Sequence, residues 1–342
     1  MGNKNLNAAA KAKKDKFYTQ LEDIENELRH YREFFAGKVV LCNCDDPFES
    51  NFFKYFAAKF NDLELKKLIC TSYADSPIAG LELNLFPDGK TAYMVEVNEL
   101  KDWNGDGGED LDDVAFAIEH GIYKKQPLTG DLNYCAGDFH SAELVKLLRQ
   151  ADVVVTNPPF SVFREFVALM IAANKKFLIV GNMNAITYKE IFPLIMQNKL
   201  WLGYGFRGMV GFFASPYEDF ASASEHREGM IRNSGVHWFT NIETPKRYWE
   251  LDLWKEYSPE EYPRYDNYDA IEVSKTDHIP VDYFGVMGVP ITFLDKYNPE
   301  QFELHGCTYS YGDCGCHVAG TDWNAYLNGK RMFKRLFIRR RQ

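Results

Sequence analysis

The pattern of apolar and polar positions near the start of the chain predicts two helices, each followed by a strand. Residues 17–35 carry an apolar side chain at every third or fourth position, which is the spacing of one face of a helix. The apolar run 38–43 predicts a buried strand. A helix over about 49–60 and another strand over 67–71 are expected to follow it.

The same succession returns further along the chain. Residues 90–97 alternate like a half-exposed strand, and 140–150 have the pattern of a helix. A buried strand over 152–156, a helix over about 161–174 and a strand over 176–180 follow. Nearly continuous apolar strands that alternate with helices predict an α/β fold around a parallel sheet. Ligands of such sheets bind beyond the carboxyl ends of the strands.

The chain changes character after about residue 200. Residues 200–300 are rich in Tyr, Trp, Gly and Pro, and only the short pieces 235–241 and 291–294 look like strands. We interpret this part as the last strands of the sheet followed by a separate recognition region. The acidic segment 99–113 is interpreted as an insertion in the first half.

The charge is distributed unevenly along the chain. The formal net charge is −10, yet residues 1–16 carry five Lys with one Asp, and residues 330–342 carry seven Lys and Arg with no acid. Basic ends on an acidic body fit a protein that touches phosphate locally, whereas two solvated tails are the alternative. We therefore expect a basic flexible arm over 1–16, a main domain over 17–245, and a recognition region over 246–342 with a basic C-terminus.

The motif Asn157-Pro158-Pro159-Phe160 follows directly on the predicted strand 152–156. The amino group of adenine is a poor nucleophile, because its lone pair is delocalised into the ring. Two acceptors aimed at the amino hydrogens, the Asn157 side-chain oxygen and the Pro158 carbonyl, would stabilise the transition state of its methylation. The paired prolines hold the turn rigid, and Phe160 offers a flat face for an extruded base. A Pro-Pro turn that only closes a strand is the alternative.

Four further stretches accompany this motif. They are Phe17-Tyr18-Thr19-Gln20, the turn Cys44-Asp45-Asp46-Pro47 with the residues before it, Gly137-Asp138-Phe139, and Gly288–Tyr297. With these stretches the chain resembles the EcoRI-type adenine-specific DNA methyltransferases, from about residue 15 to its end. Asn-Pro-Pro-Phe alone is shared by several methyltransferase families. The turn Cys44–Pro47 and the stretch Gly288–Tyr297 are far more specific to this family.

The resemblance implies a Rossmann-like class I methyltransferase sheet with a C-terminal target-recognition region, and S-adenosylmethionine as cofactor. Residues 17–245 would then be the S-adenosylmethionine-binding catalytic domain. The residues implied to contact the cofactor are Phe17, Tyr18 and Thr19, then Cys44, Asp45, Asp46 and Pro47, then Thr71, Ser72 and Tyr73, and finally Asp138 and Phe139.

These implied roles have physical support of different kinds. A carboxylate at Asp45 or Asp46 can accept from the cofactor's ammonium or ribose beside a helix N-terminus, although an N-cap pair is the alternative. Asp138 could accept from the cofactor's adenine, and Phe139 could stack on it. An ordinary helix start with Thr19 as N-cap is the alternative for the first stretch.

Contacts with DNA are expected from the part of the chain after about residue 200. The candidates for phosphate or base-edge contacts are Arg207, Lys246, Arg247, Arg339 and Arg340. Solvated surface cations are the alternative for each of them.

Three other patterns resemble ligand sites. Gly203–Gly208 fits G-x-G-x-x-G without a following helix pattern, so we interpret it as a turn. Asp102, Asn104, Asp106 and Gly107 match the first half of a calcium-binding loop, but position twelve is Asp113 rather than Glu, and a solvated loop with Asx turns is favoured. Cys307, Cys314, Cys316 and His317 lack a standard zinc spacing. No metal is therefore predicted.

The cysteines indicate a reducing compartment. There are seven of them, an odd number, with no apolar leader at the N-terminus and no apolar run of membrane-spanning length. We expect reduced thiols in a cytoplasmic protein without membrane contact.

The sequence thus predicts an adenine-specific DNA methyltransferase. It would transfer a methyl group directly from S-adenosylmethionine to N6 of a flipped-out adenine in a specific double-stranded DNA sequence, with no covalent enzyme intermediate. A restriction endonuclease that acts on the same site without direct contact is a further candidate partner. Two alternatives stay open: methylation of an amino group on RNA or of a protein amide, and a non-catalytic DNA-binding protein that keeps the fold.

Overall fold

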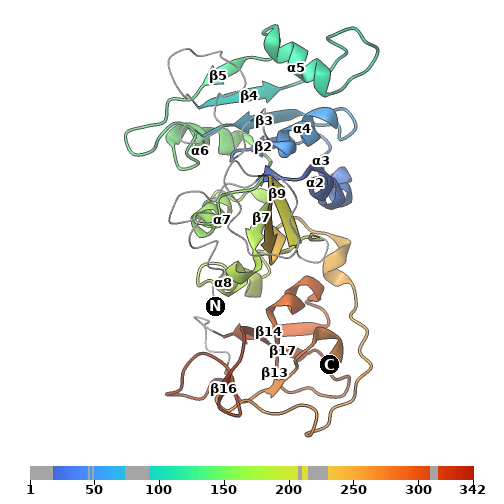
Figure 1. Cartoon of the computed structure of the whole chain (residues 1–342), viewed down its shortest axis with the longest axis vertical. Helices are drawn as coiled ribbons and strands as arrows, with labels where there is room; N and C mark the ends of the chain where they lie inside the picture. The colour runs from blue at the N-terminus through green and yellow to red at the C-terminus, as the bar shows by residue number, and fades with distance from the viewer. Residues whose placement is uncertain are drawn as a thin grey trace. The chain divides into compact units, whose positions relative to one another are not determined.

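The computed structural model describes residues 18–44, 47, 50–73, 92–206, 210–214, 230–308 and 315–342. It divides into two compact units (Figure 1), of which unit 1 comprises residues 1–181 and 205–242, and unit 2 residues 182–204 and 243–342. The expected boundary at 245 lies close to the observed one. Residues 182–204 nevertheless belong to unit 2, where Thr187 accepts a 2.7 Å hydrogen bond from Lys334.

Unit 1 contains most of the predicted strands and helices. In chain order they are β1 (Tyr18–Thr19), α2 (Leu21–Leu28), the 3-10 helix η1 (Arg29–Tyr31), α3 (Arg32–Phe35), β2 (Val39–Cys42), α4 (Asn51–Ala58), β3 (Lys67–Thr71), β4 (Tyr93–Val97), α5 (Leu111–Glu119), β5 (Lys125–Pro127), α6 (Ala142–Gln150), β6 (Val153–Thr156), α7 (Phe163–Ala172), β7 (Lys176–Asn182), β9 (Val210–Ala214), β10 (Met230–Ser234) and β11 (Val236–Thr240).

The large sheet of unit 1 has the strand order β5-β4-β3-β2-β6-β7-β11. Its centre is parallel, because β2 pairs in parallel with β3 and β6, and β6 with β7. The prediction of a parallel sheet is wrong at one edge, where β3, β4 and β5 pair antiparallel. The alternating burial of β4 suits such an edge, since antiparallel strands often expose one face. The outcome is a mixed α/β sheet whose parallel core matches the predicted fold class.

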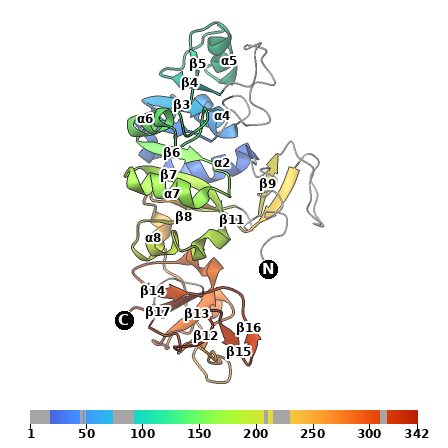
Figure 2. The ribbon, with the colours of Figure 1, turned by 90° about the vertical axis from the view of Figure 1, so that its left-hand side faces the viewer.

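Helices cover both faces of this sheet. Figures 1 and 2 show α2 and α4 on one side, and α6 and α7 on the other. Helix α7 buries Phe163, Phe166, Val167 and Met170 at helical spacing. Helix α6 begins where the Ser141 hydroxyl accepts from the Leu144 N–H at 3.2 Å, which satisfies one of the free donors of its first turn.

The predicted helix over 17–35 begins later than expected. Residues 18–19 form β1, which pairs antiparallel with β9, and β9 pairs antiparallel with β10. Gln20, not Thr19, is the N-cap of α2, so the interpretation of Thr19 as a cap is wrong. Strand pairing with residues almost two hundred positions away overrides the helical periodicity at this end.

Unit 2 is built from short elements. In chain order they are η2 (Met183–Thr187), α8 (Phe192–Met196), β8 (Trp201–Leu202), η4 (Pro245–Tyr248), β12 (Ile271–Glu272), η5 (Thr276–His278), β13 (Met287–Pro290), η6 (Ile291–Lys296), β14 (Phe302–Cys307), β15 (Tyr326–Leu327), β16 (Lys330–Arg331) and β17 (Arg335–Arg340).

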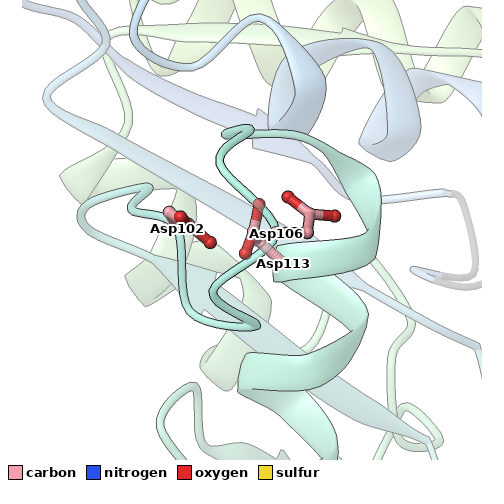
Figure 3. Close-up of side chains that lie close together, drawn as sticks. All are labelled: Asp102, Asp106 and Asp113. Carbon is pink, nitrogen blue, oxygen red and sulfur yellow. The ribbon is translucent and has the colours of Figure 1, made fainter.

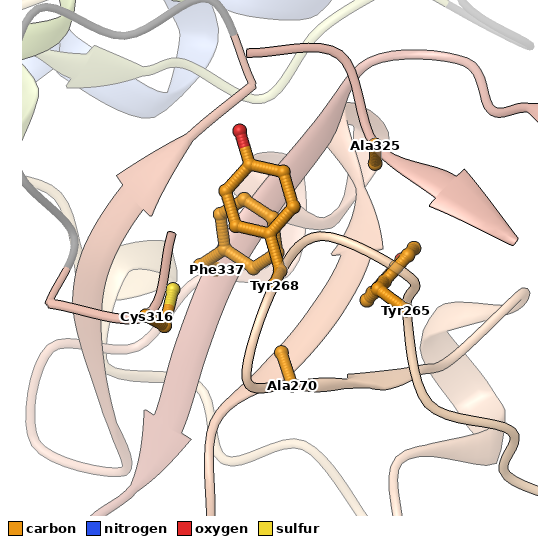
Figure 4. Packing of buried hydrophobic residues seen from close by; sticks show 6 residues of the cluster. All are labelled: Tyr265, Tyr268, Ala270, Cys316, Ala325 and Phe337. Atoms are coloured by element: carbon orange, nitrogen blue, oxygen red, sulfur yellow. The ribbon is translucent and has the colours of Figure 1, made fainter. Parts of the chain in front are cut away.

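The core of unit 2 lies around the basic C-terminus. Strand β17 is central in the sheet β12-β13-β17-β14 and buries Leu336, Phe337 and Ile338, so the alternative of a solvated tail is wrong for this strand. Figure 4 shows Phe337 beside Tyr268, with Tyr265, Ala270, Cys316 and Ala325 in the same cluster. The strand predicted over 291–294 is wrong as well, because these residues form η6 directly after β13.

No helix among the described residues is both long and apolar enough to cross a membrane.

Candidate active site

Asn157 lies at the carboxyl end of β6, in the centre of the parallel sheet. Its side chain is only 6% exposed, and Pro158 is buried as well. The Pro159 carbonyl accepts a 3.1 Å hydrogen bond from the Val162 N–H, which closes a turn that leads into α7. The motif thus stands between a buried strand and a helix, as the sequence predicts, while the roles of its residues stay predictions.

The N-terminal strand reaches this motif. The Thr19 hydroxyl accepts a 3.3 Å hydrogen bond from Asn157 Nδ2, and the Thr19 carbonyl accepts a 2.8 Å bond from Asn51 Nδ2. Of the first predicted stretch, Phe17 lies outside the described residues, and Tyr18 belongs to β1. The sequence does not single out Asn51, since nothing in its local pattern distinguishes it from any polar residue at a helix start.

The turn after β2 lies beside β6 and supplies two of the predicted residues. Cys44 is buried with its Sγ 3.9 Å from the Asn43 Oδ1, and Pro47 is buried as well. Asp45 and Asp46 lie outside the described residues. Helix α4 begins just beyond, where the Ser50 hydroxyl accepts from the Phe52 N–H at 3.1 Å. Since β2 and β6 are parallel neighbours, this turn and Asn157 share one edge of the sheet.

The tip of β3 and the loop before α6 come together at the same edge. Gly137 has φ +82°, and a Cβ built there would collide with the Ser72 carbonyl oxygen and stand 2.9 Å from the Tyr73 Cα. Cys135 Sγ lies 3.3 Å from the Tyr73 hydroxyl. The structure therefore brings two predicted groups together, Thr71 to Tyr73 and Gly137 to Phe139, although more than sixty positions separate them.

Hydrogen bonds from its own backbone and side chains stabilise the loop that carries Asp138. Asp138 Oδ1 accepts from the His140 N–H at 2.8 Å, and His140 Nδ1 lies 3.0 Å from the same oxygen. Asp131 anchors the start of the loop by accepting from the Ala142 N–H at 2.8 Å, and this bond is the main cause that lowers the pKa of Asp131. Phe139 is 8% exposed and packs edge-to-face on Phe166, with ring centroids 5.1 Å apart.

The residues described at this edge offer polar partners that fit a nucleoside. The Thr71 hydroxyl is buried without a hydrogen bond to any described residue, so a polar partner remains to be supplied there. The Asp138 Oδ2 makes no hydrogen bond within the described part of the chain. Gly137 allows the loop to approach the β3 tip more closely than a residue with a Cβ could.

Two of the cations predicted to contact DNA are engaged inside unit 2. Lys246 Nζ donates to the Gly203 carbonyl at 2.6 Å and pairs with Asp295. Arg247 is 8% exposed, stacks 3.8 Å from the Trp201 ring, and pairs with Glu243 at 2.6 Å. These contacts stabilise unit 2, and DNA binding by either residue stays a prediction.

The other predicted DNA contacts have different environments. Arg339 is exposed on β17, opposite Glu303 of β14. Arg340 lies 5.1 Å above the Phe284 ring, and its Nε and Nη1 are buried without a hydrogen bond to any described residue. Arg207 lies outside the described residues. Contacts of all three with DNA stay predictions.

The acidic segment forms the loop with Asx turns that the sequence favours. Figure 3 shows Asp102 and Asp106 of the loop before α5 close to Asp113 in the first turn of that helix. Asp102 accepts from the N–H groups of Gly105 and Gly107 at 2.6 and 3.0 Å. Backbone N–H groups, that of Asn104 foremost, hold the pKa of Asp113 below its usual range. Much of the carboxylate capacity of this loop is thus used by its own backbone.

The remaining patterns have structural explanations. Gly205 has φ +94°, and a Cβ there would stand 2.5 Å from His237 Nε2, so the glycine is needed for a close approach. The Gly205 N–H donates to the buried Glu27 carboxylate at 2.8 Å. Cys316 packs in the apolar cluster, whereas the His317 ring stacks on Trp323 with centroids 4.0 Å apart. Cys314 and Gly208 lie outside the described residues.

Comparisons with known proteins identify the family of this chain. The family model described as "Adenine-specific methyltransferase EcoRI" matches residues 5–341. The chain is 45% identical over 312 residues to Type II methyltransferase M.EcoRI of Escherichia coli, with 88% of each chain covered. It is 36% identical over 355 residues to Type II methyltransferase M.MpnI of Mycoplasma pneumoniae, with 98% of each covered. No solved structure matches the chain. The chain therefore belongs to the EcoRI family of adenine-specific methyltransferases.

Proposed function

We propose that this chain transfers a methyl group from S-adenosylmethionine to N6 of an adenine that has been flipped out of a specific double-stranded DNA sequence. Family membership supports the adenine-specific methyltransferase activity. The single observation that carries the chemistry is the position of Asn157, buried at the carboxyl end of a central parallel strand and followed by two prolines.

Asn157 and Pro158 act on the amino group. The Asn157 Oδ1 and the Pro158 carbonyl accept the two N6 hydrogens, which favours a geometry in which the nitrogen lone pair leaves conjugation with the ring. These acceptors become most effective as the new C–N bond forms and the nitrogen acquires positive charge. The buried strand and the turn into α7 hold both acceptors in place before the base arrives.

S-adenosylmethionine, when bound, supplies a methyl group on a positively charged sulfur. Asp138 and Phe139 would receive its adenine, with Thr71, Ser72 and Tyr73 beneath its nucleoside. The turn with Cys44, Asp45, Asp46 and Pro47 would receive its amino acid part. The close approach of Gly137 to Ser72, the orphaned Thr71 hydroxyl and the spare Asp138 oxygen support this assignment.

Phe160 stacks on the extruded adenine, and unit 2 supplies the contacts that select the DNA sequence. Arg339 is the exposed candidate among the predicted cations of β17.

We also propose that the chain works in the cytoplasm and shares its recognition site with a restriction endonuclease, without direct contact between the two proteins.

Methyl transfer from S-adenosylmethionine labelled in the methyl group tests this function. The full chain is incubated separately with adenine-containing duplexes, with single-stranded RNA and with protein acceptors. Label in N6-methyladenine of duplex DNA, at one sequence context, is the expected result. Label only in RNA or in a protein amide, or duplex binding without transfer, would contradict the proposal.

A further inference from the structure

Thr19 and Asn157 are far apart in the chain and in direct contact in the fold. The Thr19 hydroxyl lies 3.3 Å from Asn157 Nδ2, across 138 positions of sequence. Both side chains are buried, at 2% and 6% exposure. A buried hydrogen bond of this kind is little weakened by competition with water.

The backbone of Thr19 is held on two sides. Asn51, the first residue of α4, donates from its side chain to the Thr19 carbonyl at 2.8 Å. Within the strand pair β1 and β9, Thr19 lies opposite Phe213, a fully buried residue. The hydroxyl is therefore presented to Asn157 from a backbone that is anchored by a helix start and by a strand.

We propose that Thr19 is a positioning residue that holds the Asn157 amide with Nδ2 toward β1 and Oδ1 toward the substrate. The terminal torsion of an asparagine is broad and roughly two-fold, so the sheet alone does not select between the oxygen and the nitrogen. In the fold the Thr19 hydroxyl accepts from Nδ2, and this buried hydrogen bond holds the amide in that rotation. It directs the other end of the amide, Oδ1, to the adenine N6, where a donor in its place would repel the amino hydrogens.

This inference rests on the proposed function, because it assumes that Asn157 accepts from the amino group. It assigns Thr19 a different role from the cofactor contact that the family resemblance implies. The two roles have different kinetic consequences. A positioning residue changes the rate of transfer on bound reactants, whereas a cofactor contact changes the affinity for the cofactor.

Thr19→Val tests the proposal, since valine keeps the shape and removes the acceptor. We expect kcat to fall about 10- to 100-fold, as for a small misplacement of a catalytic group. KM for DNA and the dissociation constant of S-adenosylmethionine, measured by calorimetry, should stay within about two-fold. Thr19→Ser keeps the hydroxyl and should retain most of the wild-type kcat.

Thr244→Val is the matched control. Thr244 is also buried, at 3% exposure, but its hydroxyl makes no hydrogen bond within the described residues. The same exchange there should leave kcat unchanged. Asn51→Asp is a second variant, because a carboxylate cannot donate to the Thr19 carbonyl. Asn51→Asp should lower kcat without weakening cofactor binding. It tests the positioning role of Thr19 even if Thr19→Val does not fold.

Two results would overturn the inference. One is a kcat of Thr19→Val and Asn51→Asp equal to that of the wild type. The other is a loss in Thr19→Val that saturating S-adenosylmethionine restores, which would make Thr19 a cofactor contact. Either result leaves methylation of adenine by the wild type standing. A wild type that does not methylate adenine would instead contradict the proposed function.

Discussion

Replacement of Gly137 by alanine tests whether the loop before α6 and the tip of β3 form one cofactor site. The residue has φ +82°, and its Cβ would meet two backbone groups, the Ser72 carbonyl and the Tyr73 Cα. A left-handed backbone costs a residue with a Cβ about 1–2 kcal/mol. Overpacking adds about 1–3 kcal/mol where the neighbouring atoms cannot move easily. The neighbours here are backbone atoms, which cannot shift without moving β3 and its loop. The expected loss in unfolding free energy is thus about 2–5 kcal/mol.

Gly121→Ala separates the two contributions. Gly121 also has positive φ, at +71°, but no atom lies within 4 Å of a Cβ built there. The loss in unfolding free energy of Gly121→Ala should be limited to the backbone penalty of about 1–2 kcal/mol.

Both variants are compared by chemical denaturation and by calorimetric titration with S-adenosylmethionine. Gly137→Ala should also bind the cofactor at least about ten-fold more weakly, since relief of the clash moves Asp138 and Phe139 from Ser72. Equal stability of the two variants, together with wild-type cofactor affinity, would refute the reasoning.

Two further predictions concern unit 2. Arg335→Met should lower its stability by about 3–5 kcal/mol, because Arg335 and Glu272 form a buried pair at 2.7 Å and the carboxylate would be left uncompensated. Arg264→Met, which breaks the exposed pair with Asp269, should cost less than about 1 kcal/mol in the same denaturation experiment, and equal losses would contradict this account. Burial lowers the pKa of His305, although Glu303 opposes the shift, so the folded chain disfavours the protonated ring. Its contribution to stability should be present above about pH 6.5 and be lost as the pH falls below that value. His305→Gln should therefore show a smaller loss of stability between pH 7 and pH 5 than the wild type, and identical pH profiles would rule out this role.

Local patterns in the sequence predict the centre of the fold well. Strand β6 is a run of apolar residues that is buried throughout, and α7 places its apolar residues on one face. The position of Asn157 follows from these two elements alone, because a strand that runs into Pro-Pro must end there. The place of the Asn157-Pro158-Pro159-Phe160 motif in the fold is therefore predictable from residues 153–172 without any long-range information.

Other parts depend on partners that no local pattern reveals. β1 is a strand because it pairs with β9, although its residues continue a helical periodicity. The basic C-terminus is a central strand because it pairs with β13 on one side and β14 on the other, and because Phe337 packs against Tyr265 and Tyr268 from much earlier in the chain. The antiparallel edge of the large sheet likewise follows from how β4 and β5 return to β3. Tertiary pairing decides these elements.

The candidate site shows the same division. The tip of β3 and the loop with Asp138 were predicted separately, and their contact at Gly137 emerges only in the fold. Lys246 and Arg247 look like surface cations in the sequence, whereas Asp295, Glu243 and Trp201 engage them in unit 2. Charge alone does not distinguish a cation that pairs internally from one that meets phosphate.

Asn157→Ala gives the most direct test of the central claim that the Asn157 amide activates an adenine amino group. The measurement is the rate of label transfer from S-adenosylmethionine into N6-methyladenine of duplex DNA, together with the dissociation constant of the cofactor. The account predicts that transfer falls by at least about 10²–10³-fold, while the cofactor binds as it does to the wild type. A variant that still methylates adenine at a rate near that of the wild type would contradict it.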